Sequence, residues 1–111
     1  MLLIVHPKQR HMSLSAASVY LLRCADGSLY CGITTKPVEE RVSEHNHATF
    51  AGYTARRRPV VLLWSEEFSD IADAVATERR IKGWSRAKKL ALAAQDWAGV
   101  QALAVAYERR K

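Results

Sequence analysis

The sequence predicts a single α+β domain. Two strand-like runs come first, followed by a helical pattern, a third strand-like run and three further helical patterns. The chain has 111 residues, enough for one modest core, and it shows no internal repeat and no linker-like stretch. We therefore expect one domain.

Residues 18–34 predict the first two strands, joined as a hairpin. Two short runs rich in Val, Leu, Ile and Tyr flank an Asp-Gly pair, which readily takes the positive φ angles of a tight turn. The strands carry Tyr20 and Tyr30, and Gly32 follows the second tyrosine. Taken alone, these residues fit the β-propensity of tyrosine and a glycine that forms a bulge or a packing notch.

A helix is predicted over residues 38–46. Pro37 suits the first helical position, and two glutamates in the first turn complement the helix dipole. The spacing i, i+3, i+4, i+7 places four residues on one face: Val38, Arg41, Val42 and His45. Because two valines share this face, we expect Arg41 and His45 to lie at a semi-buried edge toward the hairpin. A surface helix could instead point them outward.

A loop over residues 46–59 precedes the third strand. It contains Gly52, Pro59 and the basic run at 56–58. The run from Val60 to Trp64 is continuously apolar, which predicts a buried central strand.

The next helix is predicted from the caps Ser69 and Asp70 to about residue 82, and it ends at Gly83. Glu78 falls on its inner face, among apolar positions that recur at helical spacing. A carboxylate there is costly unless it is paired or binds a cation. Two interpretations stay open, a structural glutamate with an arginine partner and a metal ligand or catalytic carboxylate.

Two more helices complete the chain. Ser85 can cap one helix to about Ala94, and Asp96 can cap the last. Four residues of the last helix recur at helical spacing, Trp97, Val100, Ala104 and Tyr107, and the two aromatic residues among them are expected to form surface that covers the core. We expect residues 1–17 to form a loosely ordered extension, 18–95 the main domain, and 96–111 a helix packed on that domain.

The charge of the chain is strongly basic and uneven. The net charge is +6 and the isoelectric point is about 9.7. Twelve of the 17 basic residues lie at or beyond position 56: Arg56, Arg57, Arg58, Arg79, Arg80, Lys82, Arg86, Lys88, Lys89, Arg109, Arg110 and Lys111. Clustered cations at this isoelectric point favour a nucleic-acid partner, with a merely solvated basic surface as the alternative.

The cysteine content and the apolar first residues of the chain argue against a zinc site, a signal peptide and a membrane span. Two cysteines, Cys24 and Cys31, cannot form a four-ligand zinc site, and we interpret them as reduced, small apolar residues of a cytoplasmic protein. The apolar start is too short for a signal peptide or a membrane span, so we expect no membrane association.

The ordered set of these residues resembles the GIY-YIG nuclease family, in particular its small standalone bacterial members. Val19-Tyr20-Leu21 precedes Tyr30-Cys31-Gly32 by about ten residues, Arg41 is followed by His45, and Glu78 lies on a later helix. The resemblance covers residues 18–94. The first motif reads Ser18-Val19-Tyr20 and the second has Cys31 in the place of isoleucine, which changes packing residues and keeps both tyrosines and the glycine.

The resemblance implies a three-stranded antiparallel sheet flanked by helices, with five residues in one cleft: Tyr20, Tyr30, Arg41, His45 and Glu78. It implies an endonuclease that hydrolyses DNA, branched, damaged or single-stranded, and needs no small-molecule cofactor. Glu78 would hold one Mg²⁺ or Mn²⁺, and Arg41 would bind nonbridging phosphate oxygens.

By the same resemblance, Tyr20 would orient or deprotonate the attacking water, and Tyr30 would position that water or contact the phosphate. The ordinary pKa of tyrosine, about 10, requires a nearby cation for this task. His45 would relay the proton or orient Tyr20. Gly32 would let the backbone approach the nucleic acid, and seven cations would hold the flanking backbone: Arg56, Arg57, Arg58, Lys82, Arg86, Lys88 and Lys89.

A shared site constrains the hairpin. A strict two-residue loop would pair Ala25 with Ser28 and place Tyr20 and Tyr30 on opposite faces. We therefore predict an odd-length loop or a bulge, with Gly27 at positive φ.

Two alternatives to the nuclease stay open. One is a nucleic-acid-binding module of the same fold that does not cleave. The other is a basic domain whose aromatic residues bind a protein partner, which predicts no salt-dependent binding of DNA.

Overall fold

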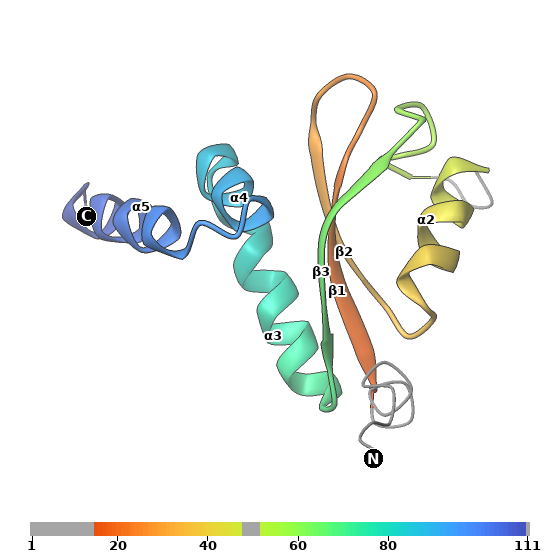
Figure 1. Cartoon of the computed structure of the whole chain (residues 1–111), viewed down its shortest axis with the longest axis horizontal. Coiled ribbons are helices and arrows are strands. Elements are labelled where there is room, and N and C mark those ends of the chain that lie inside the picture. Colours follow the sequence, from red (N-terminus) through yellow and green to blue (C-terminus); the bar gives the residue numbers. More distant parts are fainter. Residues whose placement is uncertain (1–14, 48–51, 111) are drawn as a thin grey trace, which may run out of the picture.

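The computed structural model describes residues 15–47 and 52–110, with side chains up to residue 103. Three antiparallel strands form one sheet in the order β2-β1-β3: β1 Ala17–Arg23, β2 Leu29–Thr34 and β3 Val61–Phe68 (Figure 1). The central strand is β1. The expectation of a central strand at 60–64 is therefore wrong, because β3 pairs only with β1 and forms an edge of the sheet.

The hairpin loop has an odd number of residues, as predicted. In each cross-strand pair of the hairpin, such as Tyr20 and Gly32, the two residue numbers add up to 52. Cys24 and Ser28 continue this register, since Cys24 donates its backbone N–H to the carbonyl of Ser28. The loop therefore holds three residues and ends at Gly27, whose φ is +85°. In this register the even-numbered residues of both strands lie on one face, so Tyr20 and Tyr30 share it.

The apolar run before and within β3 serves both faces of the sheet. Between Leu21 and Leu22 the register to β3 shifts, so that Leu21 opposes Trp64 while Leu22 opposes Leu62. This bulge reverses the alternation of side chains. Leu62 then packs with Tyr20 on one face, and Trp64 packs with Leu21 on the other, which explains a continuous apolar run in an edge strand.

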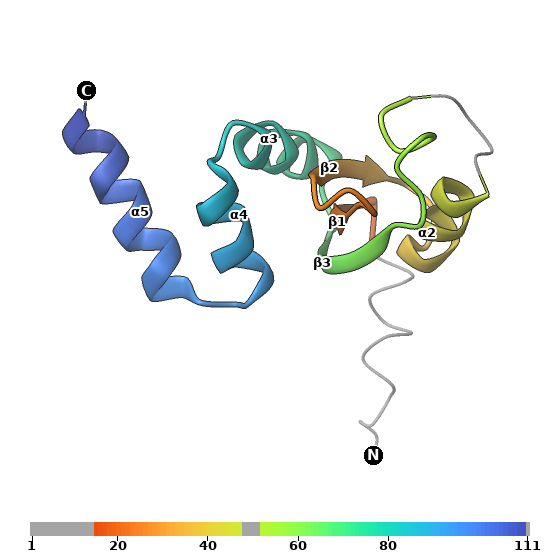
Figure 2. The same cartoon turned by 90° about the horizontal axis from the view of Figure 1, so that it is seen from above.

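In the described part of the chain, four helices surround and extend the sheet: α2 Val38–Asn46, α3 Ile71–Lys82, α4 Arg86–Ala93 and α5 Trp97–Arg110. Of the two caps predicted for α3, the structure uses Asp70, and Ser85 caps α4 as predicted; both side chains accept from backbone N–H groups of their helix. Helices α2 and α3 lie on opposite sides of the sheet (Figures 1 and 2). The sheet therefore separates two apolar clusters, one around Tyr20 and Leu22 and one around Val19 and Leu21.

The two ends of the chain differ from the expectations. Ala17 belongs to β1 and is buried, so order begins before residue 18; residues 1–14 lie outside the described part of the chain. Helix α5 contacts α4 and leads away from the sheet (Figure 2). Val100 packs on the core, but the expectation for Trp97 is wrong, because this residue is 55% exposed. The side chains of Ala104 and Tyr107 lie outside the description.

The predicted role of the cysteines agrees with the structure, since Cys24 and Cys31 are both free and buried. Burial and the nearby Glu78 raise the pKa of the Cys31 thiol to about 11, so it stays protonated at neutral pH. Within the described residues, no helix has the length and apolar character of a membrane span.

Candidate active site

Two tyrosines lie on the face of the sheet that α2 covers. Tyr20 extends from β1 and Tyr30 from β2, and their ring centroids are 6.4 Å apart. Tyr20 is fully buried, whereas Tyr30 is partly exposed. The hairpin register thus places both tyrosines in one cluster, with Tyr20 as the inner and Tyr30 as the outer residue.

Gly32 provides the space for the inner ring. A Cβ atom at position 32 would lie 2.5 Å from both Cζ and Oη of Tyr20, closer than side chains tolerate. The packing notch is therefore the alternative that the structure supports. A contact between Gly32 and nucleic acid stays a prediction.

We expect Gly32→Ala to lower the free energy of unfolding by about 1–3 kcal/mol, because the added methyl group overpacks the Tyr20 ring. Chemical denaturation measures this change. Gly83→Ala is the matched control, since its Cβ would meet the Arg80 carbonyl at 3.6 Å, an ordinary contact. Equal effects of the two substitutions would show that position 32 is not specially tight.

Helix α2 adds Arg41 and His45 to the cluster, as the helical spacing predicted. The hydroxyl of Tyr20 lies 2.9 Å from Nε2 of His45, and Nε of Arg41 donates to the same hydroxyl at 3.4 Å. The imidazole also packs edge-on against Tyr30, at 5.4 Å between centroids. On its other side, Nδ1 of His45 lies 2.6 Å from Oγ1 of Thr54.

The protonation states in this cluster follow from burial. Burial raises the pKa of Tyr20, and the hydrogen bond from Arg41 offsets only part of the increase. Burial and the adjacent Arg41 cation lower the pKa of His45 below its usual 6.5. At neutral pH, Tyr20 is therefore a phenol and His45 a neutral imidazole, so the cation beside Tyr20 does not by itself supply a tyrosinate.

Glu44 holds Arg41, and Lys36 in turn holds Glu44. Nη1 of Arg41 donates to Oε1 of Glu44 at 3.0 Å, and the ammonium of Lys36 bonds to the other carboxylate oxygen. These bonds lower the pKa of Glu44, so the carboxylate is charged. Glu44 thereby fixes one end of a guanidinium whose Nε faces Tyr20.

Glu78 comes from the other side of the sheet. It lies on α3, is 8% exposed, and forms an ion pair of 2.6 Å with the exposed Lys82 one turn later. The backbone carbonyl of Glu78 lies beside the thiol of Cys31, the neighbour of Tyr30 in β2. The predicted arginine partner is thus replaced by a lysine, and the convergence of Glu78 with the other four residues stays a prediction.

The edge strand β2 is where the two sides of the sheet can meet. A pocket of about 360 Å³ at the end of β2 is lined from α2 by Arg41 and from α3 by Ile71 and Val75. Glu78 lies one turn beyond Val75 on α3. Residues of both helices therefore line one pocket at this edge of the sheet.

The side chains present fit a divalent cation only as part of a complex with substrate. Among the residues that the structure describes, no three His, Cys, Asp or Glu side chains form a group that could hold a metal ion. Mg²⁺ commonly binds through one or two carboxylates and completes its shell with waters and phosphate oxygens. Glu78, a carboxylate at the sheet edge, meets this minimal requirement.

Residues 52–58 cover the outer side of the cluster. The ring of Tyr53 stacks on Tyr30 at 5.8 Å, and the guanidinium of Arg57 lies 3.9 Å from the Tyr53 centroid. Arg57 also pairs with Asp26 in the hairpin turn at 3.0 Å, and its carbonyl accepts from the N–H of Ala25. This loop is thus bonded to the hairpin.

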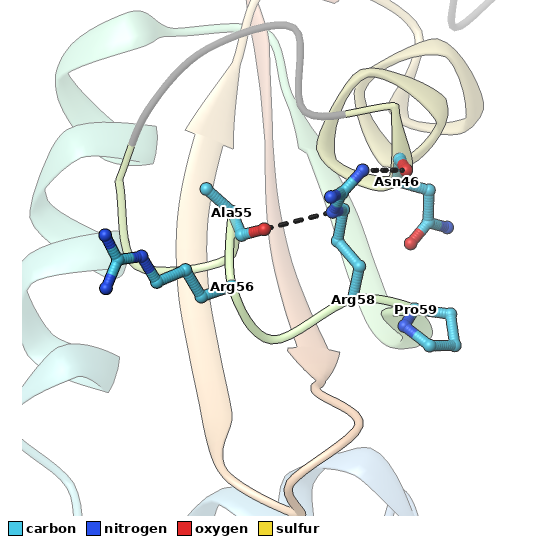
Figure 3. Close-up of a pocket in the computed structure, with 5 residues that line it drawn as sticks. All are labelled: Asn46, Ala55, Arg56, Arg58 and Pro59. Atoms are coloured by element: carbon cyan, nitrogen blue, oxygen red, sulfur yellow. Dashed lines mark hydrogen bonds between the residues drawn. The ribbon is translucent and has the colours of Figure 1, made fainter.

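The predicted DNA-binding cations have different surroundings. Arg58 donates to the carbonyls of Ala55 and Asn46 in a pocket of about 450 Å³. The exposed Arg56 also lines this pocket, with its guanidinium pointing away from Arg58 (Figure 3). Arg86 donates to the carbonyl of Gly27, and Lys88 lies over the Trp84 ring at 4.1 Å. Lys82 is paired with Glu78, and Lys89 is partly buried. Their contact with nucleic acid stays a prediction.

Sequence reasoning missed Glu44, Tyr53 and Thr54. Glu44 lies three residues after Arg41, a helical spacing at which opposite charges meet, so it could have been found. Tyr53 and Thr54 lie in a loop, where no periodicity indicates direction.

Comparisons with known proteins show what this chain is similar to. The model of the GIY-YIG catalytic domain matches residues 16–91. A UPF0213 protein of Staphylococcus haemolyticus is 49% identical over 72 residues, which cover 65% of this chain and 87% of that protein. A UPF0213 protein of Halobacterium salinarum is 47% identical over 74 residues, 67% of this chain and 95% of that protein. The solution structure of a UPF0213 protein from Bacillus halodurans is 35% identical, with a TM-score of 0.47, and covers 71% of this chain and 83% of that one.

Proposed function

Because the chain belongs to the GIY-YIG family, which implies a nuclease-type activity, we propose that it is a divalent-metal-dependent endonuclease that hydrolyses phosphodiester bonds in DNA. The observation that carries the proposal is the buried hydroxyl of Tyr20, held between Arg41 and His45 beside a second tyrosine. Around the Tyr20 phenol, the neutral imidazole of His45 can accept a proton, and the guanidinium of Arg41 can bind a phosphate.

Arg41 is the residue that meets the phosphate. Its side chain is 28% exposed, and its bond to Tyr20 is long, at 3.4 Å. A guanidinium donates well to two nonbridging phosphate oxygens. When Arg41 turns to the phosphate, it uncovers the Tyr20 hydroxyl for the attacking water, while the outer Tyr30 positions that water.

The proton of the water then passes to Tyr20 Oη, and Tyr20 gives its own proton to Nε2 of His45. This route suits neutral pH, because the final acceptor is an imidazole whose pKa lies below 6.5 rather than a phenol whose pKa is raised. A cation held by Glu78 would stabilise charge on the phosphate and on the leaving oxygen.

The direct test incubates the purified protein with labelled branched and single-stranded DNA, with Mg²⁺ or with EDTA. We expect nicking with Mg²⁺ and none with EDTA. Salt-dependent binding without nicking would instead support a non-cleaving module. No salt-dependent binding would support a protein-interaction domain.

Replacing Arg56, Arg57 and Arg58 together by glutamine should weaken DNA binding with little sequence preference. The slope of log affinity against log salt should flatten by about 0.9 for each lost duplex phosphate contact. Because Arg57 and Arg58 also hold the loop, Arg56→Gln is the matched single variant and should flatten the slope without lowering the melting temperature. An unchanged slope in both variants would remove this loop from the binding surface.

A further inference from the structure

Thr54 touches the site from a loop that no motif includes. It is 3% exposed, and its Oγ1 lies 2.6 Å from Nδ1 of His45. His45 is itself 1% exposed. The contact is therefore a buried hydrogen bond between a hydroxyl and the ring nitrogen that faces away from Tyr20.

The direction of this hydrogen bond follows from the other members of the chain. Arg41 can only donate to Tyr20 Oη, so the buried phenol needs a different acceptor for its own proton. Nε2 of His45, at 2.9 Å, is that acceptor. In a neutral imidazole the remaining proton then lies on Nδ1, which donates to Oγ1 of Thr54.

The loop around Thr54 is anchored on both sides. Tyr53 stacks on Tyr30, and Arg57 joins the loop to Asp26 in the hairpin turn. At the far end of the loop, Asn46 of α2 bonds to the backbone N–H and carbonyl of Val60. The position of Oγ1 is therefore set by contacts with the hairpin and with α2.

We propose that Thr54 is a positioning residue that holds the His45 ring in the tautomer protonated at Nδ1. This tautomer keeps Nε2 unprotonated and aimed at Tyr20, which is the state that can receive the Tyr20 proton. The effect of this tautomer on cleavage rests on the proposed function, but the tautomer itself can be measured without any cleavage activity.

The first measurement is NMR of the isotope-labelled imidazole nitrogens of His45. We expect the proton on Nδ1 in the wild-type protein and in Thr54→Ser, which keeps the hydroxyl. In Thr54→Val, which has nearly the same shape but no acceptor, Nδ1–H loses its partner, so the fraction of His45 rings protonated at Nε2 should rise; an unchanged fraction in the folded variant would contradict the role of Thr54. A proton on Nε2 in the wild-type protein would overturn the proposal, and this result does not require that any variant folds.

The second measurement is cleavage by the same proteins. Thr54→Val should lower the cleavage rate about a hundredfold, the lower end of what one positioned proton acceptor contributes. DNA affinity should not change, and Thr54→Ser should recover most of the rate. A Thr54→Val protein that folds and cleaves at the wild-type rate would contradict the positioning role. Failure of the wild-type protein to cleave would instead refute the proposed function, while the tautomer measurement would still decide the role of Thr54.

Discussion

Glu78→Gln is expected to lower the rate of DNA cleavage by orders of magnitude in a protein that still folds and binds DNA. The amide keeps the shape of the side chain but removes the negative charge that a divalent cation requires. Additional Mg²⁺ or Mn²⁺ should restore little activity. The proposed DNA binding rests on the basic residues, so affinity for DNA should hold or rise slightly.

The structure makes this test sharper. Loss of a buried partner would strand a charge and cost about 3–5 kcal/mol. The partner of Glu78, however, is Lys82, whose side chain is 54% exposed, and an ion pair with an exposed member contributes only about 0–1 kcal/mol. The melting temperature should therefore change little.

Asp73→Asn is the matched control, because it removes the same charge from an exposed position of the same helix. It should cleave like the wild-type protein. A Glu78→Gln variant that melts far lower but cleaves normally per folded molecule would make Glu78 structural and leave the cation without a ligand.

Tyr20→Phe is expected to lower cleavage by about 10²–10⁴-fold, the range for one positioned proton-transfer group. The phenyl ring still fills the notch over Gly32, so the fold should persist. The lost hydroxyl leaves Nε2 of the buried His45 without its partner, which costs about 1–3 kcal/mol of stability. Single-turnover cleavage and denaturation of the same sample separate the two effects.

The pH dependence of the wild-type rate identifies the final proton acceptor. His45 must be neutral to accept the proton, and its pKa is lowered by burial and by Arg41. Activity should therefore be lost as the pH falls through a value below 6.5 and be complete above it. If activity instead requires a pH near or above the usual tyrosine range, Tyr20 acts as a tyrosinate and His45 only orients it.

Local sequence determined the helices of this protein. Capping residues and apolar spacing lie within a few positions of each other, so residues 38–46 and the caps Asp70 and Ser85 could be identified from neighbours alone. The shared face of Arg41 and His45 followed from the same periodicity. The sequence also required a hairpin loop with an odd number of residues at Gly27. Side chains alternate between the two faces of a strand, and both tyrosines had been assigned to one site.

The arrangement of the sheet was decided by the tertiary structure. An apolar run shows that a strand is buried, but not whether its neighbours lie on one side or both. The run at 60–64 therefore predicted a central strand, whereas the bulge opposite Leu21 and Leu22 lets an edge strand place Leu62 and Trp64 on different faces.

The protonation states of the tyrosine and histidine cluster were also decided by the tertiary structure. The identity of Tyr20 was visible in the sequence, but the direction of its pKa shift depends on burial and on Arg41, which lies 21 positions away. The contact between His45 and Thr54 joins a helix to an aperiodic loop. Desolvation and hydrogen bonding act through space, so only the folded chain could set the protonation state of the residues that the sequence had already named.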